Sequence, residues 1–306
     1  MKNIILSCAA LALISTSAVA ADLSSGSTDY SAPAPASGNI MASRFGIAFD
    51  TYYVDQADND DGTFADGWKY GGNIELALAS ESATGWGGQL DILGSAFADN
   101  DLGNDRDWTR GYLTGAVHLY SRMPSGVYGA FAGGGFTEDT GDSDESQTYW
   151  FLGIEGQRQM DNTILFGQVG YLDGDDEYEE VLNQGGFARI GARRFTQSNT
   201  AYMAALSGAF GKQDNNDEDD PSALIGNIEL EAEHGYGSGE TSLFASYEGT
   251  FVSFDGGDHN TNFHSFMLGL RWYPGATNLM SAYAGPGSLD LPSFGRWASF
   301  TANEVE

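Results

Sequence analysis

The sequence is poor in cysteine and in basic residues, and each shortage excludes a class of protein. Cys8 is the only cysteine among 306 residues, so no disulfide within the chain can stabilise the fold. Thirteen Lys and Arg residues stand against 43 Asp and Glu residues, and only three of the bases are lysines. The formal net charge of −30 argues against a nucleic-acid partner, because phosphate binding needs a basic surface.

Long apolar runs are also missing after the first 20 residues, which predicts that no transmembrane helix follows them. The N-terminal stretch "MKNIILSCAALALISTSAVA" has the features of a signal peptide: a basic start at Lys2, an apolar centre, and small residues before Ala21. We expect 1–20 to be removed on export. Lipidation at Cys8 is the less favoured alternative, because the apolar run before it is too short. Residues 21–38 form a Ser/Ala/Pro-rich stretch that we expect to be a periplasmic linker.

Glycine and aromatic residues are abundant, and apolar side chains recur with a period of two. The chain holds 42 Gly, 18 Phe, 15 Tyr and 6 Trp, but only 7 Pro. The pentapeptide Gly-Asn-Ile-Glu-Leu occurs twice, in "GNIELALAS" from Gly72 and in "GNIELEAEHG" from Gly226. In both copies the apolar side chains alternate with polar ones that include glutamate, which is the pattern of a strand with one apolar face.

The alternation continues through most of the chain and predicts an all-β protein with twelve strands. Each predicted segment has the length that a tilted strand needs to cross a bilayer, or slightly more. The segments are 40–54, 67–80, 86–97, 108–121, 126–137, 148–159, 163–172, 186–196, 200–211, 223–235, 241–254 and 262–273.

The connections between these segments alternate between short and long, and the long ones are acidic. Five connections are short and carry three acidic residues, whereas six longer ones, such as "DQADNDDGTFADG" and "DGDDEYEEVLNQG", hold 27 of the 43. Short periplasmic turns and longer extracellular loops are the normal asymmetry of a membrane-spanning β-barrel. A secreted β-sandwich, the main alternative, also has alternating strands but does not explain this sorting of its loops.

The two faces of each predicted strand have opposite chemistry. In 223–235, Ile228 and Leu230 share one parity, and Glu229 and Glu231 share the other. We interpret the apolar parity as facing lipid and the polar parity as facing a lumen. An open sheet edge within lipid would leave backbone groups unpaired, so the sheet must close. Aromatic residues near segment ends fit interfacial girdles; these are Trp68, Trp86, Trp108, Tyr120, Trp150, Tyr202, Trp272 and Tyr273.

The signal-like N-terminus, the twelve alternating segments and the loop asymmetry together resemble a Gram-negative outer-membrane β-barrel protein. Within that group the chain resembles the small 12-stranded, porin-like channels. The resemblance implies a transmembrane antiparallel up-and-down β-barrel over 39–274, located in the outer membrane and in contact with its lipid, with small solutes as partners. It leaves the solute and the oligomeric state open.

The C-terminal residues depart from that resemblance. Such barrels usually end on an aromatic residue of the last strand, whereas here residues 275–306 follow "LGLRWYPG". We assign them to a periplasmic tail with no clear hairpin pattern. The tail could be largely disordered, lie against the periplasmic mouth, enter the lumen, or bind a partner.

Charged residues of both signs fall on the parity assigned to the lumen. Because an isolated charge in a dry interior is prohibitively costly, these groups must be paired or hydrated. A narrow passive pore for small charged or zwitterionic solutes satisfies this need, and small inward residues such as Gly71 and Gly153 favour open space. A closed structural or adhesive barrel with a salt-bridged lumen is the alternative. The predicted pore-lining residues are Arg44, Lys69, Glu75, Asp91, Arg110, Glu155, Arg189, Arg193, Glu229, Glu231, Glu248 and Arg271.

Catalytic and metal sites have weaker support. His264 and Ser265 are consecutive in a predicted strand and must point to opposite faces. Asp258 and His259 lie beside an acidic loop, where a surface hydrolase could be built, but we expect no enzyme. The acidic connections lack the spacing of a defined calcium loop. We expect no cofactor beyond diffuse Ca²⁺ or Mg²⁺ association.

Overall fold

The computed structural model describes residues 40–56, 67–98, 109–139, 146–174, 184–197, 199–212, 222–237, 239–254 and 260–292. The expected signal peptide and linker, and most of each acidic connection, lie outside these residues. Within them, no helix has the length and apolar character that would let it cross a membrane.

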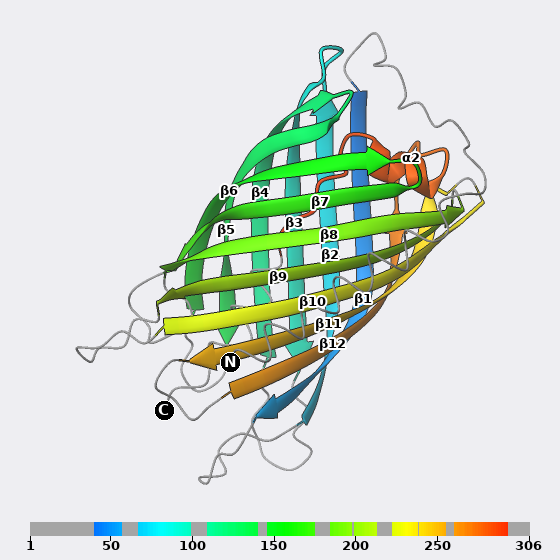
Figure 1. Ribbon diagram of the computed structural model, residues 1–306. Coiled ribbons are helices and arrows are strands. Elements are labelled where there is room, and N and C mark those ends of the chain that lie inside the picture. The colour runs from blue at the N-terminus through cyan, green and yellow to red at the C-terminus, as the bar shows by residue number, and fades with distance from the viewer. Residues whose placement is uncertain are drawn as a thin grey trace, which may run out of the picture. The chain divides into compact units, whose positions relative to one another are not determined.

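Twelve antiparallel strands within the described residues form one sheet that closes on itself (Figure 1). Each strand pairs with its neighbours in the sequence, and β1 pairs with β12, with Phe45 opposite Trp272. The strands are β1 (Ile40–Gln56), β2 (Gly67–Glu81), β3 (Trp86–Ala98), β4 (Thr109–Met123), β5 (Gly126–Asp139), β6 (Ser146–Met160), β7 (Thr163–Gly174), β8 (Gln184–Gln197), β9 (Thr200–Lys212), β10 (Ser222–Tyr236), β11 (Thr241–Phe254) and β12 (Asn260–Trp272).

The predicted all-β, closed up-and-down barrel with twelve strands is therefore confirmed. The predicted bounds differ from the observed ones by at most two residues; β6, for example, was expected at 148–159 and spans Ser146–Met160. The two ends of the barrel differ in their connections. The short-turn end holds the connections β2–β3, β4–β5, β6–β7, β8–β9 and β10–β11, and the long-connection end holds the others.

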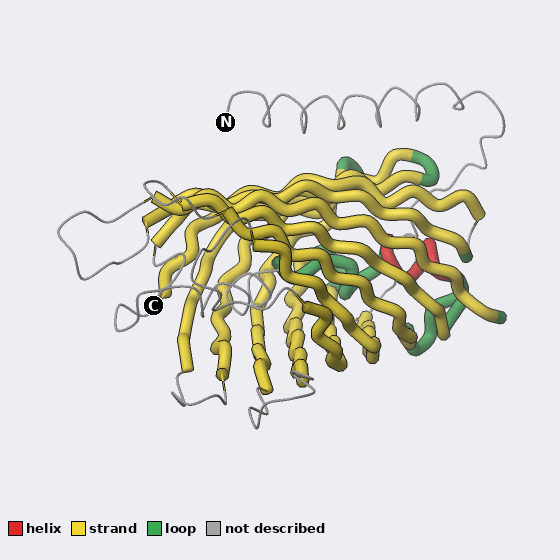
Figure 2. The backbone as a smooth tube through the Cα atoms, turned by 90° about the horizontal axis from the view of Figure 1, so that it is seen from below, coloured by secondary structure: helices red, strands yellow, loops and turns green. Residues whose placement is uncertain are grey.

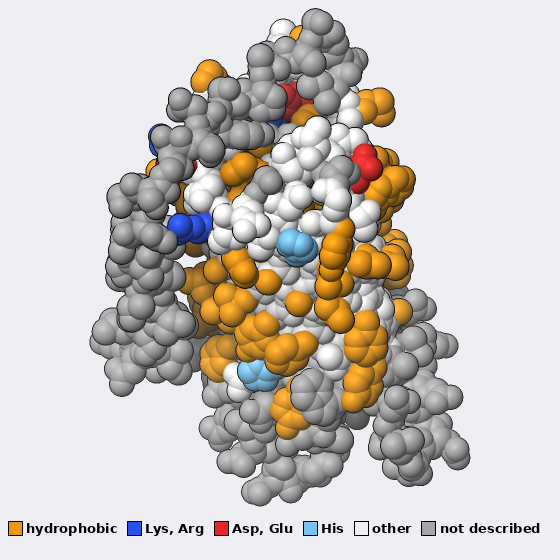
Figure 3. Space-filling model, turned by 90° about the vertical axis from the view of Figure 1, so that its right-hand side faces the viewer, with side chains coloured by type: hydrophobic (Ala, Val, Ile, Leu, Met, Phe, Trp, Pro, Cys, Tyr) orange, Lys and Arg blue, Asp and Glu red, His pale blue; other side chains and the backbone are white. Residues whose placement is uncertain are grey.

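The outer wall is apolar, as the parity predicts (Figure 3). Ile190 is 69% exposed and Ile154 is 62% exposed, because both side chains point away from the lumen. Exposed aromatic side chains lie near both ends of the barrel, where membrane–water interfaces favour them. They include Trp86, Tyr128, Tyr202, Tyr236 and Trp272 at the short-turn end, and Tyr70, Phe136, Trp150, Tyr171 and Phe210 at the other.

The girdle prediction was wrong at two positions. Tyr120 is 1% exposed and Tyr273 is 5% exposed, because both side chains turn inward. Tyr120 packs against Val127 and Leu289, and Tyr273 packs against the helix described next. The side chains of Trp68 and Trp108 lie outside the described residues.

The described part of the tail enters the barrel. Asn278 caps the N-terminus of helix α2 (Leu279–Ala284), and its side chain accepts a hydrogen bond from the Ser281 backbone N–H. Leu279 and Tyr283 are fully buried against residues of β7, β8 and β9 at the short-turn end. Figure 2 shows α2 inside the ring of strands. Of the placements left open by the sequence, residues 279–292 adopt the lumenal one, and 293–306 lie outside the described residues.

The outward parity can be tested by a charge placed at two depths. Ile190→Arg, near the middle of β8, should cost about 2–4 kcal/mol of folding free energy in lipid, whereas Tyr202→Arg, near an interface, should cost about 0–1 kcal/mol. Unfolding of both variants by denaturant in lipid vesicles measures the difference. Equal tolerance at the two positions would contradict the lipid-facing assignment.

Candidate functional site

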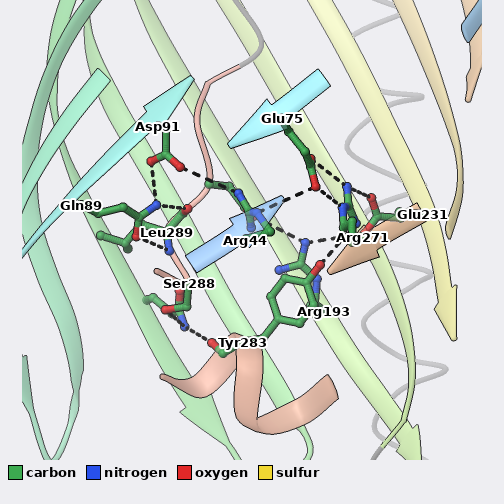
Figure 4. A network of polar contacts seen from close by, with 12 residues as sticks. Arg44, Glu75, Gln89, Asp91, Arg193, Glu231, Arg271, Tyr283, Ser288 and Leu289 are labelled. Carbon is green, nitrogen blue, oxygen red and sulfur yellow. Dashed lines mark hydrogen bonds and ion pairs between the residues drawn. The ribbon is translucent and has the colours of Figure 1, made fainter. Parts of the chain in front are cut away.

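The inward side chains form three layers along the lumen. An apolar layer around α2 occupies the short-turn end, and an aromatic layer occupies the long-connection half. Between them lies a charged layer, seen in part in Figure 4. We define the charged layer as Arg44, Glu75, Asp91, His118, Glu155, Arg189, Arg193, Glu229, Glu231, Glu233, Glu248 and Arg271.

Arg271 on β12 joins three carboxylates in the charged layer. Its Nε lies 2.6 Å from Glu75 Oε1, its Nη2 lies 2.8 Å from Glu231 Oε2, and its Nη1 lies 3.2 Å from Glu233 Oε2. Its guanidinium carbon lies 3.9 Å from the centroid of the Phe244 ring. The planar guanidinium can satisfy several acceptors at once, so β2 and β10 are connected across the lumen through β12.

Arg193 connects the wall to α2. Its guanidinium carbon lies 3.8 Å from the centroid of the Tyr283 ring, and its Nη2 lies 3.8 Å from Glu231 Oε1. The Tyr283 hydroxyl donates to Glu233 Oε2 at 2.6 Å. Burial is the main cause that raises the pKa of Tyr283, and the neighbouring Glu233 raises it further against the opposing effect of Arg193. Tyr283 therefore remains a hydrogen-bond donor at any physiological pH.

Arg189 and Glu229 form a bidentate pair between β8 and β10. Arg189 Nε donates to Glu229 Oε1 at 3.0 Å, and Nη2 donates to Oε2 at 2.6 Å. The Arg189 guanidinium also lies over the Phe166 ring, 5.0 Å from its centroid. Its Nη1 is buried and has no hydrogen-bond partner within the described part of the chain. One donor of this buried side chain is thus available to an acceptor in the lumen.

His118 lies between two carboxylates. Its Nδ1 is 2.7 Å from Glu155 Oε1 and its Nε2 is 3.0 Å from Asp91 Oδ2. The ring is fully buried and stacks on Phe131, with centroids 5.6 Å apart. Only the doubly protonated imidazolium can present an N–H to both carboxylates. His118 therefore acts as a fixed cation within the charged layer.

The aromatic layer fills space that the sequence analysis assigned to an opening. Its rings belong to Tyr52, Phe97, Tyr112, Phe131, Tyr149, Phe151, Phe187 and Phe263. A Cβ at Gly71 would lie 2.4 Å from Phe97 Cδ1, and one at Gly153 would lie 2.6 Å from Phe131 Cζ. These glycines make room for neighbouring rings, so the expectation that Gly71 and Gly153 indicate open space was wrong.

A cavity of about 130 Å³ remains between the charged layer and the aromatic layer. Two residues of the tail, Asp290 and Leu291, form part of its wall. Six carboxylates and four guanidinium groups line it, together with apolar side chains that include Met203, Phe244 and Met267. Its charged lining residues are Arg44, Glu75, Asp91, Arg189, Arg193, Glu229, Glu231, Glu248, Arg271 and Asp290.

Nine of the predicted pore-lining residues thus meet at one cavity: Arg44, Glu75, Asp91, Arg189, Arg193, Glu229, Glu231, Glu248 and Arg271. Glu155 also points inward and contacts His118. The side chains of Lys69 and Arg110 lie outside the described residues. That these residues line a conducting pore stays a prediction.

Several polar residues of the lumen were not among the predicted pore-lining residues. Gln168 donates to Glu155 Oε2 at 3.2 Å, and Ser265 donates to Asp50 Oδ1 at 2.8 Å. Asp50 shares the inward parity of β1 with Arg44, so that parity was the available signal. The inward neighbours of Gln168 on β7 include the apolar Ile164, Phe166 and Leu172 and gave no such signal. Asp290 had no such signal, because the tail has no periodic pattern.

His264 and Ser265 do not face each other and so cannot act together as a base and a nucleophile. His264 points outward and contacts the Tyr247 hydroxyl at 2.9 Å, whereas Ser265 points inward. Asp258 and His259 lie outside the described residues, as do most of the acidic residues considered for Ca²⁺ or Mg²⁺. In the ranges that the structure covers, no group of three or more His, Cys, Asp or Glu is arranged to hold a metal ion.

The Arg189–Glu229 pair can be tested by a double-mutant cycle. Glu229→Leu leaves Arg189 buried without its partner and should lower the free energy of unfolding by about 3–5 kcal/mol. Arg189→Met leaves Glu229 buried without its partner and should also be destabilising, whereas Arg189→Met combined with Glu229→Leu removes both charges and should recover most of the loss. Denaturant titration in lipid vesicles measures all three variants. Additive losses in the double variant would show that the two side chains are not coupled.

Comparison with known proteins places the fold and leaves the family open. No family model matches the chain, and no curated protein matches it. An outer-membrane channel from Pseudomonas putida F1 is similar in structure, with a TM-score of 0.50 and 14% identity over 81% of this chain and 98% of that one. The translocator domain of the autotransporter NalP from Neisseria meningitidis gives a TM-score of 0.44 and 14% identity over 88% of this chain and 97% of that one. With its closed ring of twelve antiparallel strands and its apolar outer wall, the chain has the fold of an outer-membrane β-barrel protein.

Proposed function

We propose that the protein is an outer-membrane channel that passes small charged or zwitterionic solutes passively through a narrow lumen. The observation that carries the proposal is the cavity within the charged layer, where guanidinium and carboxylate groups from opposite parts of the wall face a shared space. A field across such a space favours solutes that carry charge, because they replace lost hydration with contacts to fixed groups.

The charges that line the cavity support a preference for cations. Even without Asp290 of the tail, the five carboxylates of the wall exceed its four guanidinium groups. One of these carboxylates, Glu248, is 6% exposed and accepts a hydrogen bond from Asn227 at 2.5 Å. The buried Nη1 of Arg189 offers a donor for an anionic group. A zwitterion could therefore place its anionic group at Arg189 and its cationic group among the carboxylates.

A structural barrel that does not conduct is the second candidate. The observations that favour it are the aromatic layer and the tail, which occupy much of the lumen, and the close ion pairs of Arg271 and Arg189. In that case the paired charges serve only to fill the interior. A barrel of twelve strands lies between the filled 8-stranded barrels and the open channels of 16–18 strands, so size alone does not decide.

Reversal potentials in planar bilayers under a salt gradient test the channel. We expect discrete conductance steps with a preference for cations, and Glu248→Gln should reduce that preference because it removes one carboxylate from the cavity. Asp161→Asn is the matched control, since Asp161 is exposed in a short turn. Silence from both the wild-type protein and Asp290→Asn, whose tail loses its charge, would favour the structural barrel once both are shown to be folded by β-sheet circular dichroism and resistance to proteolysis.

A further inference from the structure

The tail beyond α2 is held in the lumen by contacts to its backbone. Gln89 on β3 donates from Nε2 to the Leu289 carbonyl oxygen at 2.7 Å and accepts from the Leu289 N–H at 3.2 Å (Figure 4). Gln168 on β7 donates to the Asp290 carbonyl oxygen at 2.7 Å. Side-chain amides of the wall thus pair with consecutive backbone groups of the tail, much as a neighbouring strand would pair with an extended peptide.

Arg122 fixes the start of this segment at the short-turn end. Its Nη1 donates to the Ala284 carbonyl oxygen at 2.8 Å, and its Nη2 donates to the Gly285 carbonyl oxygen at 2.9 Å. The Nε of Arg122 pairs with Glu81 at 2.9 Å, which keeps the guanidinium in place. The end of α2 therefore has its carbonyl groups satisfied by the wall.

The wall of the lumen contacts the side chains of the tail as well as its backbone. Asp290 Oδ1 lies 3.5 Å from Arg44 Nη1, and Asp290 Oδ2 lies 3.5 Å from Arg193 Nη2. Leu289 is buried against Tyr120, and Leu291 packs against the aromatic layer. The sequence Leu-Asp-Leu of the tail is therefore complementary to the wall, where the carboxylate meets guanidinium groups and each leucine meets apolar side chains.

The charge of Asp290 persists at acidic pH. Burial acts to raise its pKa, but the guanidinium groups of Arg193, Arg189 and Arg44 outweigh burial and hold the pKa well below its usual range, with a smaller contribution from Arg271. The contribution of Asp290 to the free energy of unfolding is therefore fully present above the ordinary pKa of an aspartate. It is lost only as the pH falls through the lower pKa that Asp290 has in the folded protein.

The wall remains electrically satisfied when Asp290 leaves. Arg44 lies 3.9 Å from both Glu75 and Asp91, and Arg193 lies 3.8 Å from Glu231. Neither guanidinium depends on Asp290 as its sole carboxylate partner. Release of the tail thus avoids the large cost of an uncompensated buried charge, which makes exchange of the segment feasible.

We propose that the lumen holds a peptide-binding site, that residues 286–292 are its resident ligand, and that the channel is closed while they are bound. The closure rests on the proposed function, whereas the peptide site stands without it. The ligand class is an extended peptide in which one carboxylate residue lies between two aliphatic residues. The segment 286–292 closes the lumen in cis because it runs from the short-turn end through the charged layer to the aromatic layer.

A reversible crosslink in the full chain tests the closure. A Cβ at Gly287 would lie 3.8 Å from Ala42 Cβ, which suits a disulfide. The variant Ala42→Cys with Gly287→Cys, in a Cys8→Ser background, should conduct about tenfold less when oxidised than when reduced, because the tether prevents release. Each single-cysteine variant is the control and should not respond to reductant, and Gly287→Cys also reports the strain of a side chain at φ +77°.

Peptide binding is measured separately from conductance. Asp290→Asn should raise the conductance about tenfold, since it removes the charge that faces Arg44 and Arg193. A fluorescent synthetic peptide, GPGSLDLP, should bind this variant and restore closure. The same peptide with asparagine in place of its aspartate should bind about tenfold more weakly. The oxidised double-cysteine protein should bind neither peptide, because its site is occupied.

The outcomes separate the two proposals. Equal conductance of the oxidised, reduced and Asp290→Asn proteins would overturn closure by the tail and leave the channel standing. Silence of all folded variants would overturn the channel, while the binding assay still decides on the peptide site. Equal binding of the peptide to the oxidised and Asp290→Asn proteins would overturn that site.

Discussion

Pairing of the first and last strands is the interaction on which the remaining structure depends. Hydrocarbon offers no partner for a free N–H or C=O group, so the sheet must close in lipid, and β1 pairs with β12 from Phe45 to Gln56. Once the sheet is closed, the period of two divides every strand between lipid and lumen. Polar and charged side chains, which are unfavourable in lipid, then point into the lumen, where the buried charges require partners.

The charged layer meets that requirement through pairs that cross between strands. Arg271 reaches Glu75 on β2 and Glu231 on β10, and Arg189 reaches Glu229 on β10. Because carboxylates exceed guanidinium groups around the cavity, the layer keeps a negative balance that a cationic group can offset. Asp290 adds a further carboxylate to this layer from the tail, so one set of charges both fills the lumen and holds the segment that occupies it.

The wall could be predicted from the sequence because its pattern is local. Alternation of residues such as Ile228 and Glu229 determines which side chain faces lipid, and the acidic connections mark the strand ends. The contacts across the lumen could not be predicted, because they depend on the register and stagger of twelve strands. Phe97 was overlooked for a simpler reason: it is apolar on a polar parity, where it covers Gly71.

The tail was the least predictable part. Helix α2 has only six residues, and the segment after it has neither periodicity nor repeated charge. Its position depends on hydrogen bonds and ion pairs with strands that are far apart in the sequence, among them β1, β3, β4, β7 and β8. Gln89 and Leu289, for example, are 200 residues apart. A pattern that depends on such distant partners leaves no local signature in the sequence.

Amide hydrogen exchange of the folded full chain in lipid vesicles tests the central claim most directly. The account predicts slow exchange at Gly285, whose N–H donates to the Ser281 carbonyl oxygen, and at Leu289, whose N–H donates to Gln89. Residues in the exposed turn near Asp161 should exchange faster. Exchange of Leu289 at the rate of an unstructured peptide, in a barrel whose strands are protected, would contradict the lumenal placement of the tail.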